Sequence, residues 1–302
     1  MMKQVWENLA DKKYGGARGV ADPTVHDYVK LLVRKVEMDN IIEIRDDYLD
    51  AFTNWINKSQ LNSIHIDTSW KPVYSNGTTE TFDKFYMKHR NKRFRTLPGE
   101  YFYHKITFKR LNYQWKELLE ADDVKPGDAV IISMPFSDTG SEHYDMMDIL
   151  DRCYDIGVPV LLDCCYFGLC GGLDFPVNHP AITTLTFSLS KCFDVPSLRA
   201  GIRYTREDDD DPMFVYHKNN YINHFGATIG FGLLELFPSD FIPAKYHGQQ
   251  LQICERLGIV PSNCVNLATT IRTEYEYLRR GNSWSRLNVA QDFCIDTPGV
   301  IH

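Results

Sequence analysis

Short, continuous apolar segments recur along this 302-residue chain and limit the folds that it can adopt. They lie at residues 129–132, 158–162, 182–187 and 200–204. Because these runs do not alternate strictly between apolar and polar residues, both faces of each strand should be covered, as in a mostly parallel sheet. Amphipathic stretches such as residues 46–58 and 144–154 are typical of the covering helices. The sequence therefore predicts an α/β fold in which helices cover both faces of a mostly parallel sheet.

Polar residues follow three of these apolar runs. Ser137, Asp163 and Lys191 each come just beyond the carboxyl end of a predicted strand. Ligands of open α/β sheets bind at that edge. The three side chains are therefore predicted to share one binding site.

Lys191 has the most informative surroundings. It lies in the segment SLSKCFDVPSLRAG at residues 188–201, directly after an apolar run. A lysine amine can form a Schiff base with an aldehyde, while the hydroxyl of Ser188 and the guanidinium of Arg199 can hold a phosphate dianion. A Ser-x-Ser-Lys sequence alone is more often a solvated surface feature, so this interpretation depends on the other motifs.

This segment closely resembles the cofactor-lysine segment of the class I aminotransferases, which are fold-type I pyridoxal phosphate enzymes. The segment DCCYFG at residues 163–168 resembles the family's aspartate-to-tyrosine segment. The resemblance implies pyridoxal 5′-phosphate as the cofactor and Lys191 as its Schiff-base lysine. It also implies that Asp163 pairs with the protonated pyridine nitrogen and that Tyr166 bonds to the ring phenolate oxygen.

Two upstream segments fit the same series. The segment NGTTE at residues 76–80 opens an amphipathic stretch, and a helix N-terminus with free backbone N–H groups attracts anions. Gly77 and Thr78 are therefore predicted to cradle the phosphate. The segment PGEYFYH at residues 98–104 resembles the family segment that supplies the ring-stacking aromatic, with Tyr101 at that position.

The segment WSRLNVA at residues 284–290 resembles the family's terminal arginine motif. Arg286 is therefore expected to bind the substrate α-carboxylate, for which a planar guanidinium is well suited. One motif departs from the family. Where the family has an asparagine that bonds to the ring phenolate, alignment on residues 139–140 places Ser137. A serine lacks the amide donor, so that bond is predicted to be lost or water-mediated.

Each assignment has a simpler alternative. Asp163 could cap the segment that follows it, and Gly77 and Thr78 could form an ordinary strand-to-helix turn. Tyr101 adjoins two other aromatic residues and could belong to the core. Arg286 could be a surface residue. The cofactor site is favoured because five motifs occur together in the order that the family has.

Composition excludes several other classes of protein. The 33 basic and 40 acidic residues give a net charge of −7, so no basic surface for nucleic acid is expected. No apolar run reaches membrane-spanning length, and the first twenty residues lack the apolar core of a secretory signal, which favours a cytoplasmic location without a membrane partner. The eight cysteines include no Cys-x-x-Cys pair, and the histidines show no paired spacing, so no metal site is predicted.

The chain is predicted to divide into three parts. Residues 1–42 form an N-terminal arm and part of a small domain, residues 43–238 the large cofactor-binding domain, and residues 239–302 the C-terminal part of the small α/β domain. Further helices are predicted at residues 214–237 and 243–258, and further strands at residues 264–268 and 286–290.

The expected activity is that of a pyridoxal phosphate-dependent aminotransferase, which moves an amino group between an α-amino acid and a 2-oxo acid. A homodimer is expected from the resemblance alone. Ser137 and the shortened chain leave open a decarboxylase, lyase or racemase that uses the same cofactor. A non-catalytic protein with this fold is a third hypothesis, against which the presence of Lys191, Asp163, Tyr166 and Arg199 together counts.

Overall fold

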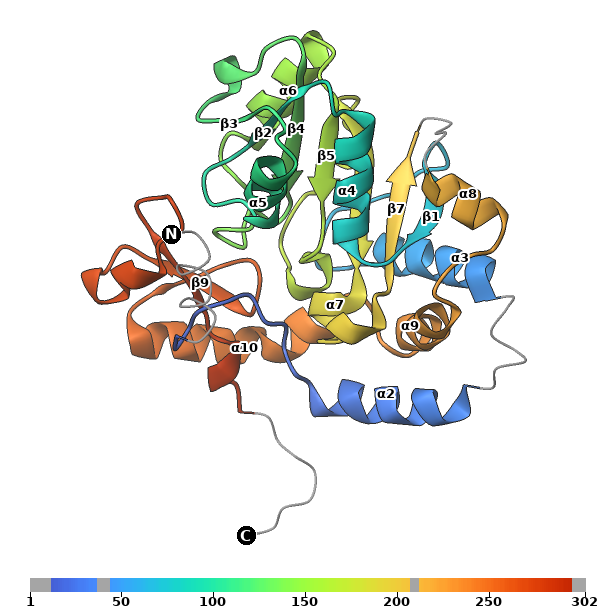
Figure 1. The fold of residues 1–302 in the computed structure, drawn as a ribbon. Coiled ribbons are helices and arrows are strands. Elements are labelled where there is room, and N and C mark those ends of the chain that lie inside the picture. The colour runs from blue at the N-terminus through green and yellow to red at the C-terminus, as the bar shows by residue number, and fades with distance from the viewer. Residues whose placement is uncertain (1–11, 37–43, 207–211, 295–302) are drawn as a thin grey trace.

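The computed structural model describes residues 12–36, 44–206 and 212–294. Its centre is a seven-stranded sheet with the order β1-β7-β6-β5-β4-β2-β3 (Figure 1). The strands are β1 (Lys71–Ser75), β2 (Arg93–Thr96), β3 (Trp115–Glu117), β4 (Asp128–Ser133), β5 (Val160–Asp163), β6 (Ile182–Ser188) and β7 (Gly201–Thr205). Strand β7 is antiparallel to both of its neighbours, and the other strands all run in one direction.

This topology puts several chain segments at one edge of the sheet. The carboxyl ends of β1, β2, β4, β5 and β6 lie there because these strands are parallel, and the reversed β7 begins at the same edge. The residues that follow the parallel strands and those that precede β7 are therefore close in space although they are far apart in sequence.

The helices cover both faces of the sheet. They are α2 (Pro23–Lys35), α3 (Ile44–Asn57), α4 (Thr78–Lys88), α5 (Tyr103–Arg110), α6 (Met146–Asp155), α7 (Leu189–Cys192), α8 (Pro212–Lys218), α9 (His224–Leu236) and α10 (Phe241–Leu257). Successive residues of β4 point to opposite sides, so Ile131 packs with α4 and α5 in one apolar cluster, whereas Ile132 belongs to the larger cluster that includes α3 and α6. Two buried faces explain why central strands such as β4 and β5 are apolar along most of their length.

A smaller unit lies beside the large sheet. Its antiparallel sheet has the order β10-β9-β8, from β8 (Val260–Pro261), β9 (Leu267–Thr270) and β10 (Ser285–Asn288), and it packs with α10 (Figure 1). The N-terminal arm joins this unit, since Asn288 donates its backbone N–H to the carbonyl of Tyr14 at 2.8 Å. The predicted fold class, a large mostly parallel α/β domain with a smaller one formed by both chain ends, is confirmed. The residue boundaries of the domains stay a prediction.

The structure differs from the local predictions in several places. Residues 23–35 form helix α2, which was not predicted, and Asp22 caps it by accepting the N–H of Val25 at 3.0 Å. The single helix predicted at residues 214–237 is two helices, since Asn220 has a left-handed φ of 56° and Asn223 starts α9 by accepting the N–H of Gly226. Strand β2 was not predicted, because Arg95 interrupts its apolar pattern. That arginine is buried and pairs with Asp128 at 2.8 Å.

Within the described residues, no single helix is long and apolar enough to cross a bilayer, although α9 and α10, which meet at 69°, satisfy the length and composition criteria as a pair.

Candidate active site

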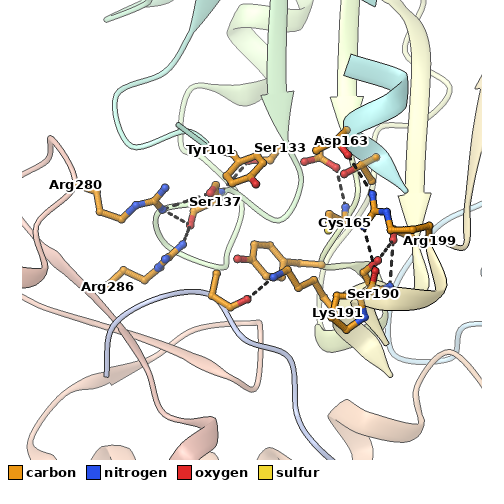
Figure 2. Close-up of a pocket in the computed structure, with 16 residues that line it drawn as sticks. Tyr101, Ser133, Ser137, Asp163, Cys165, Ser190, Lys191, Arg199, Arg280 and Arg286 are labelled. Carbon is orange, nitrogen blue, oxygen red and sulfur yellow. Dashed lines mark hydrogen bonds between the residues drawn. The ribbon is translucent and has the colours of Figure 1, made fainter. Parts of the chain in front are cut away.

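One pocket at the carboxyl edge of the large sheet contains nearly all the predicted site residues (Figure 2). Its lining residues are Ala17, Thr78, Thr79, Tyr101, Ser133, Ser137, Asp163, Cys165, Tyr166, Ser188, Ser190, Lys191, Pro196, Arg199, Arg280 and Arg286. The structure thus brings together every residue that the sequence predicted for the site except Gly77. That glycine does not line the pocket but lies against the guanidinium of Arg199.

One end of the pocket has the features of an anion site. Helix α4 begins after Gly77, and no side chain caps its first N–H groups. The guanidinium of Arg199 lies against this helix start, where its Nη2 donates to Thr79 Oγ1 at 3.1 Å. Gly77 has a φ of +78°, and a Cβ at that position would lie 2.5 Å from Arg199 Nη2, so only glycine leaves room for the arginine.

Lys191 lies on the short helix α7, which follows β6. The hydroxyl of Ser188 caps this helix by accepting the N–H of Ser190 at 3.1 Å, and it also donates to the Ser190 hydroxyl at 2.8 Å. The Lys191 amine donates to the backbone carbonyl of Ala17 at 2.7 Å. The N-terminal arm therefore crosses the pocket beside the lysine.

Asp163 is a buried carboxylate without a cationic neighbour. It ends β5, is 6% exposed, and accepts the N–H of Cys165 at 3.0 Å. No cation of the described residues is among the groups that shift its pKa. Burial, followed by the negative charge of Glu100, raises the pKa of Asp163 to about 8. A cation placed beside Asp163 would stabilise its charged form.

Glu100 is a second buried carboxylate that the sequence interpretation did not assign to the site. Its oxygens accept the backbone N–H of Ser133 at 2.7 Å and the Ser133 hydroxyl at 2.8 Å, together with the N–H of Tyr101 at 3.1 Å. Burial raises the pKa of Glu100, and these donors oppose that effect. Glu100 thereby joins the Tyr101 loop to the end of β4.

Two tyrosines line the pocket. Tyr101 stacks on Tyr103, with ring centroids 5.9 Å apart and an interplanar angle of 13°. Tyr101 also lines the pocket. Tyr166 follows β5 and is 7% exposed, and burial raises the pKa of its phenol to about 12. It therefore stays a neutral hydrogen-bond donor at neutral pH.

Two arginines of the small unit reach the opposite end of the pocket. Arg286, on β10, donates to the carbonyl oxygen of Ser137 at 2.6 Å and to that of Gly16 at 2.9 Å. Its Nε is buried and has no hydrogen-bond partner. Arg280 donates to the same Ser137 carbonyl at 3.0 Å and lies 3.4 Å from the Ser137 hydroxyl. Figure 2 shows both guanidinium groups directed at Ser137.

The residues that were missed differ in how predictable they were. Ser133 ends β4 as Asp163 ends β5, so the rule that strand ends form the site could have identified it. Glu100 lies inside the segment chosen for Tyr101, yet nothing in the sequence shows that it points inward. Arg280 directly follows Arg279, which pairs with Glu276 outside the pocket, and the sequence does not distinguish the two.

No family model and no curated protein sequence matches the chain. Solved structures do match it. An aminotransferase from Mycobacterium tuberculosis has a TM-score of 0.70 at 12% identity, over 95% of this chain and 91% of that one. An aromatic aminotransferase from Pyrococcus horikoshii has a TM-score of 0.68 at 14% identity, over 96% and 94%. A C–S lyase from Staphylococcus hominis, solved with pyridoxal phosphate and L-cycloserine, has a TM-score of 0.68 at 13% identity, over 94% and 86%.

The chain thus has the fold-type I architecture that these aminotransferases and the lyase share, as the motif resemblance implied. Within this class the neighbours catalyse different reactions, so the fold alone does not select one.

The residues of the pocket suit a pyridoxal phosphate group. The uncapped start of α4 and Arg199 are donors for a phosphate. Asp163 is buried with no cation of the described residues acting on it, and its carboxylate would accept a hydrogen bond from a protonated ring nitrogen. Lys191 lines the same pocket and supplies the amine (Figure 2).

Proposed function

We propose that this chain is a pyridoxal phosphate-dependent aminotransferase acting on an α-amino acid and a 2-oxo acid. The observation that carries the proposal is the shared pocket of Lys191, Asp163 and Arg199, since an amine, a buried carboxylate and a guanidinium at an uncapped helix start are the groups that this cofactor requires. When bound, the cofactor supplies an aldehyde that can hold an amino group and a ring that can accept the electron pair of the substrate α-carbon.

The residues of this chain have separate tasks in that reaction. Lys191 would hold the cofactor through its Nζ, and the same amine, when free, would take the proton from the substrate α-carbon. Asp163 would hold a proton on the ring nitrogen, and the Tyr166 hydroxyl would donate to the ring oxygen. Arg199, Ser188 and the start of α4 would hold the phosphate, with Gly77 and Thr78 forming the turn, and Tyr101 would contact the ring.

Arg286 is proposed to bind the substrate α-carboxylate. The Nε of Arg286 is buried without a hydrogen-bond partner, so a substrate carboxylate would give this donor an acceptor. The other nitrogens donate to two neutral carbonyl oxygens, and a charged carboxylate would be a stronger acceptor than either. One of these carbonyls, that of Gly16, belongs to the arm that also meets Lys191 through Ala17. A bound substrate would therefore compete with the N-terminal arm for the side chains of Arg286 and Lys191.

A lyase is the second candidate, because a C–S lyase shares the fold and because Ser137 replaces the family's asparagine. The two reactions differ in where the amino group goes. A transferase keeps it on the cofactor, whereas a lyase releases it as ammonia. Homodimer formation and a cytoplasmic location stay predictions from the sequence.

The first test is chemical trapping. We expect protein incubated with pyridoxal phosphate and then reduced with borohydride to carry the cofactor on a peptide containing Lys191, as mass spectrometry of the digest would show. Lys191→Ala is the control and should give no adduct at this site. A folded parent protein without any adduct would overturn the proposed function.

The same preparation separates the two reactions. Incubation with a panel of amino acids should convert bound cofactor to its aminated form together with one equivalent of 2-oxo acid, both visible by mass spectrometry. Ammonia release without aminated cofactor would instead assign the lyase reaction.

A second prediction concerns Arg286. Arg286→Ala should weaken amino-acid binding by about 1.5–3 kcal/mol, the range for hydrogen bonds to charged groups, and leave cofactor affinity nearly unchanged. Titration of the cofactor absorbance with amino acid would measure the first quantity and titration with cofactor the second. Arg256→Ala is a matched control, since that side chain is 63% exposed and outside the pocket. Equal amino-acid affinities in the parent and in Arg286→Ala would show that another residue binds the α-carboxylate.

A further inference from the structure

The substrate end of the pocket has more positive charge than one carboxylate requires. Arg280 and Arg286 both donate to the carbonyl oxygen of Ser137, at 3.0 and 2.6 Å, so their guanidinium groups lie side by side. Arg280 enters from the loop before β10 and its side chain is 10% exposed. Figure 2 shows the two groups on the side of the pocket opposite Arg199.

The nearby carboxylates neutralise this charge only in part. Asp138 Oδ1 lies 3.6 Å from Arg280 Nη1, beyond hydrogen-bond distance, and has no hydrogen-bond partner. The other oxygen of Asp138 accepts the amide of Asn282 at 2.7 Å. Glu100 offers Arg280 only its backbone carbonyl, at 3.3 Å, because its carboxylate is bonded elsewhere. No carboxylate of the described residues lies within 4 Å of Arg286.

A purely structural role does not explain the second arginine. Arg286 already holds the Ser137 carbonyl, so the bond from Arg280 to that oxygen duplicates an existing contact. The other acceptors of Arg280, the Glu100 carbonyl and the Ser137 hydroxyl, are neutral and more distant, at 3.3 and 3.4 Å. A neutral side chain could do the same without placing two cations together in a buried site. Burial, and next the charge of Arg286, lower the pKa of Arg280 to about 10, which indicates that its charge is incompletely compensated.

We infer that Arg280 binds a second anionic group, carried on the side chain of the substrate, so that the preferred amino acid is acidic. This inference rests on the proposed function, in which Arg286 takes the α-carboxylate. The second group is a carboxylate or a phosphate, both of which suit a guanidinium. A substrate with two anionic ends would pair both arginines and relieve their mutual repulsion.

The test compares two acids of equal chain length that differ in one charged end. Calorimetric titration of the cofactor-loaded protein should show succinate binding about tenfold or more tightly than butyrate, the effect of one charge-assisted contact. In Arg280→Gln the two affinities should become nearly equal, because only succinate loses a partner. Arg280→Lys keeps the charge and should retain part of the preference. Adding 3-phosphonopropionate shows whether phosphate or carboxylate is preferred.

Arg279→Gln is the matched control. Arg279 is the adjacent residue, yet it pairs with Glu276 and does not line the pocket, so the variant should keep the full preference for succinate. Equal binding of succinate and butyrate by the parent, or a loss of both ligands to the same extent in Arg280→Gln, would overturn the inference. The titration also works without cofactor, since both arginines belong to the protein. Failure to trap cofactor on Lys191 would thus defeat the proposed function separately.

Discussion

Replacing Asp163 with asparagine is expected to make the cofactor-free protein more stable at pH 8 and the loaded enzyme much slower. Asparagine keeps the size of the side chain and an oxygen for the Cys165 N–H, but it removes the buried charge. Single-turnover amination of the cofactor should slow by about 10²–10³-fold, the effect of losing one preorganised electrostatic contact, because the carboxylate stabilises the ring most when charge leaves the α-carbon.

The stability effect has a definite sign. Burial, with the charge of Glu100 next, raises the pKa of Asp163 to about 8 in the folded protein, from an ordinary value near 4. The folded state therefore binds more protons than the unfolded state between these values. This contribution to stability is complete below pH 4 and is lost as the pH rises toward 8, by about 1.4 kcal/mol per pH unit.

Urea unfolding of cofactor-free parent and Asp163→Asn protein at pH 5 and pH 7 would measure that loss. The parent should lose about 2–3 kcal/mol more than the variant between the two pH values. A parallel pH dependence in both proteins would show that Asp163 is not the titrating group. An unchanged amination rate in the variant would contradict its role beside the ring nitrogen.

The sequence contained enough to predict the sheet and the groups at its edge. Runs such as residues 129–132 are apolar on both faces because helices cover both faces, and that requirement is visible without any structure. Residues such as Asp163 and Lys191 then follow from one topological rule, since parallel strands end at one edge. Their chemistry came from the resemblance, and their proximity comes from the structure.

The remaining site residues depend on contacts between distant segments. Arg280 resembles Arg279 in every local respect, and only the packing of the small unit against the Ser137 loop decides which of the two enters the pocket. Strand β2 was missed for a related reason. Arg95 would ordinarily mark an exposed position, but its burial is compensated by Asp128, 33 residues further along the chain. Long-range ion pairs of this kind leave no local periodicity.

Gly77→Ala is expected to weaken cofactor binding through Arg199 rather than through any group of its own. The added Cβ would lie 2.5 Å from Arg199 Nη2 and 3.0 Å from its Cζ, so the guanidinium must leave the start of α4. Loss of that charge-assisted contact to the phosphate should cost about 1.5–3 kcal/mol of cofactor affinity, or roughly 10–100-fold in Kd. The φ of +78° and ψ of 173° add strain of about 1–3 kcal/mol to the stability of the folded protein.

Two comparisons separate these effects. Gly127 also has a positive φ, +88°, but nothing lies within 4 Å of a Cβ placed there, so Gly127→Ala should lower stability and leave cofactor affinity unchanged. Arg199→Ala removes the guanidinium directly, so adding Gly77→Ala to it should weaken cofactor binding little further, because both changes delete one interaction. Equilibrium titration of the parent, Gly77→Ala, Arg199→Ala and the double variant with pyridoxal phosphate would measure the coupling between the two positions. Fully additive losses would mean that Gly77 serves the phosphate site by another route, through the backbone turn that orients the first N–H groups of α4.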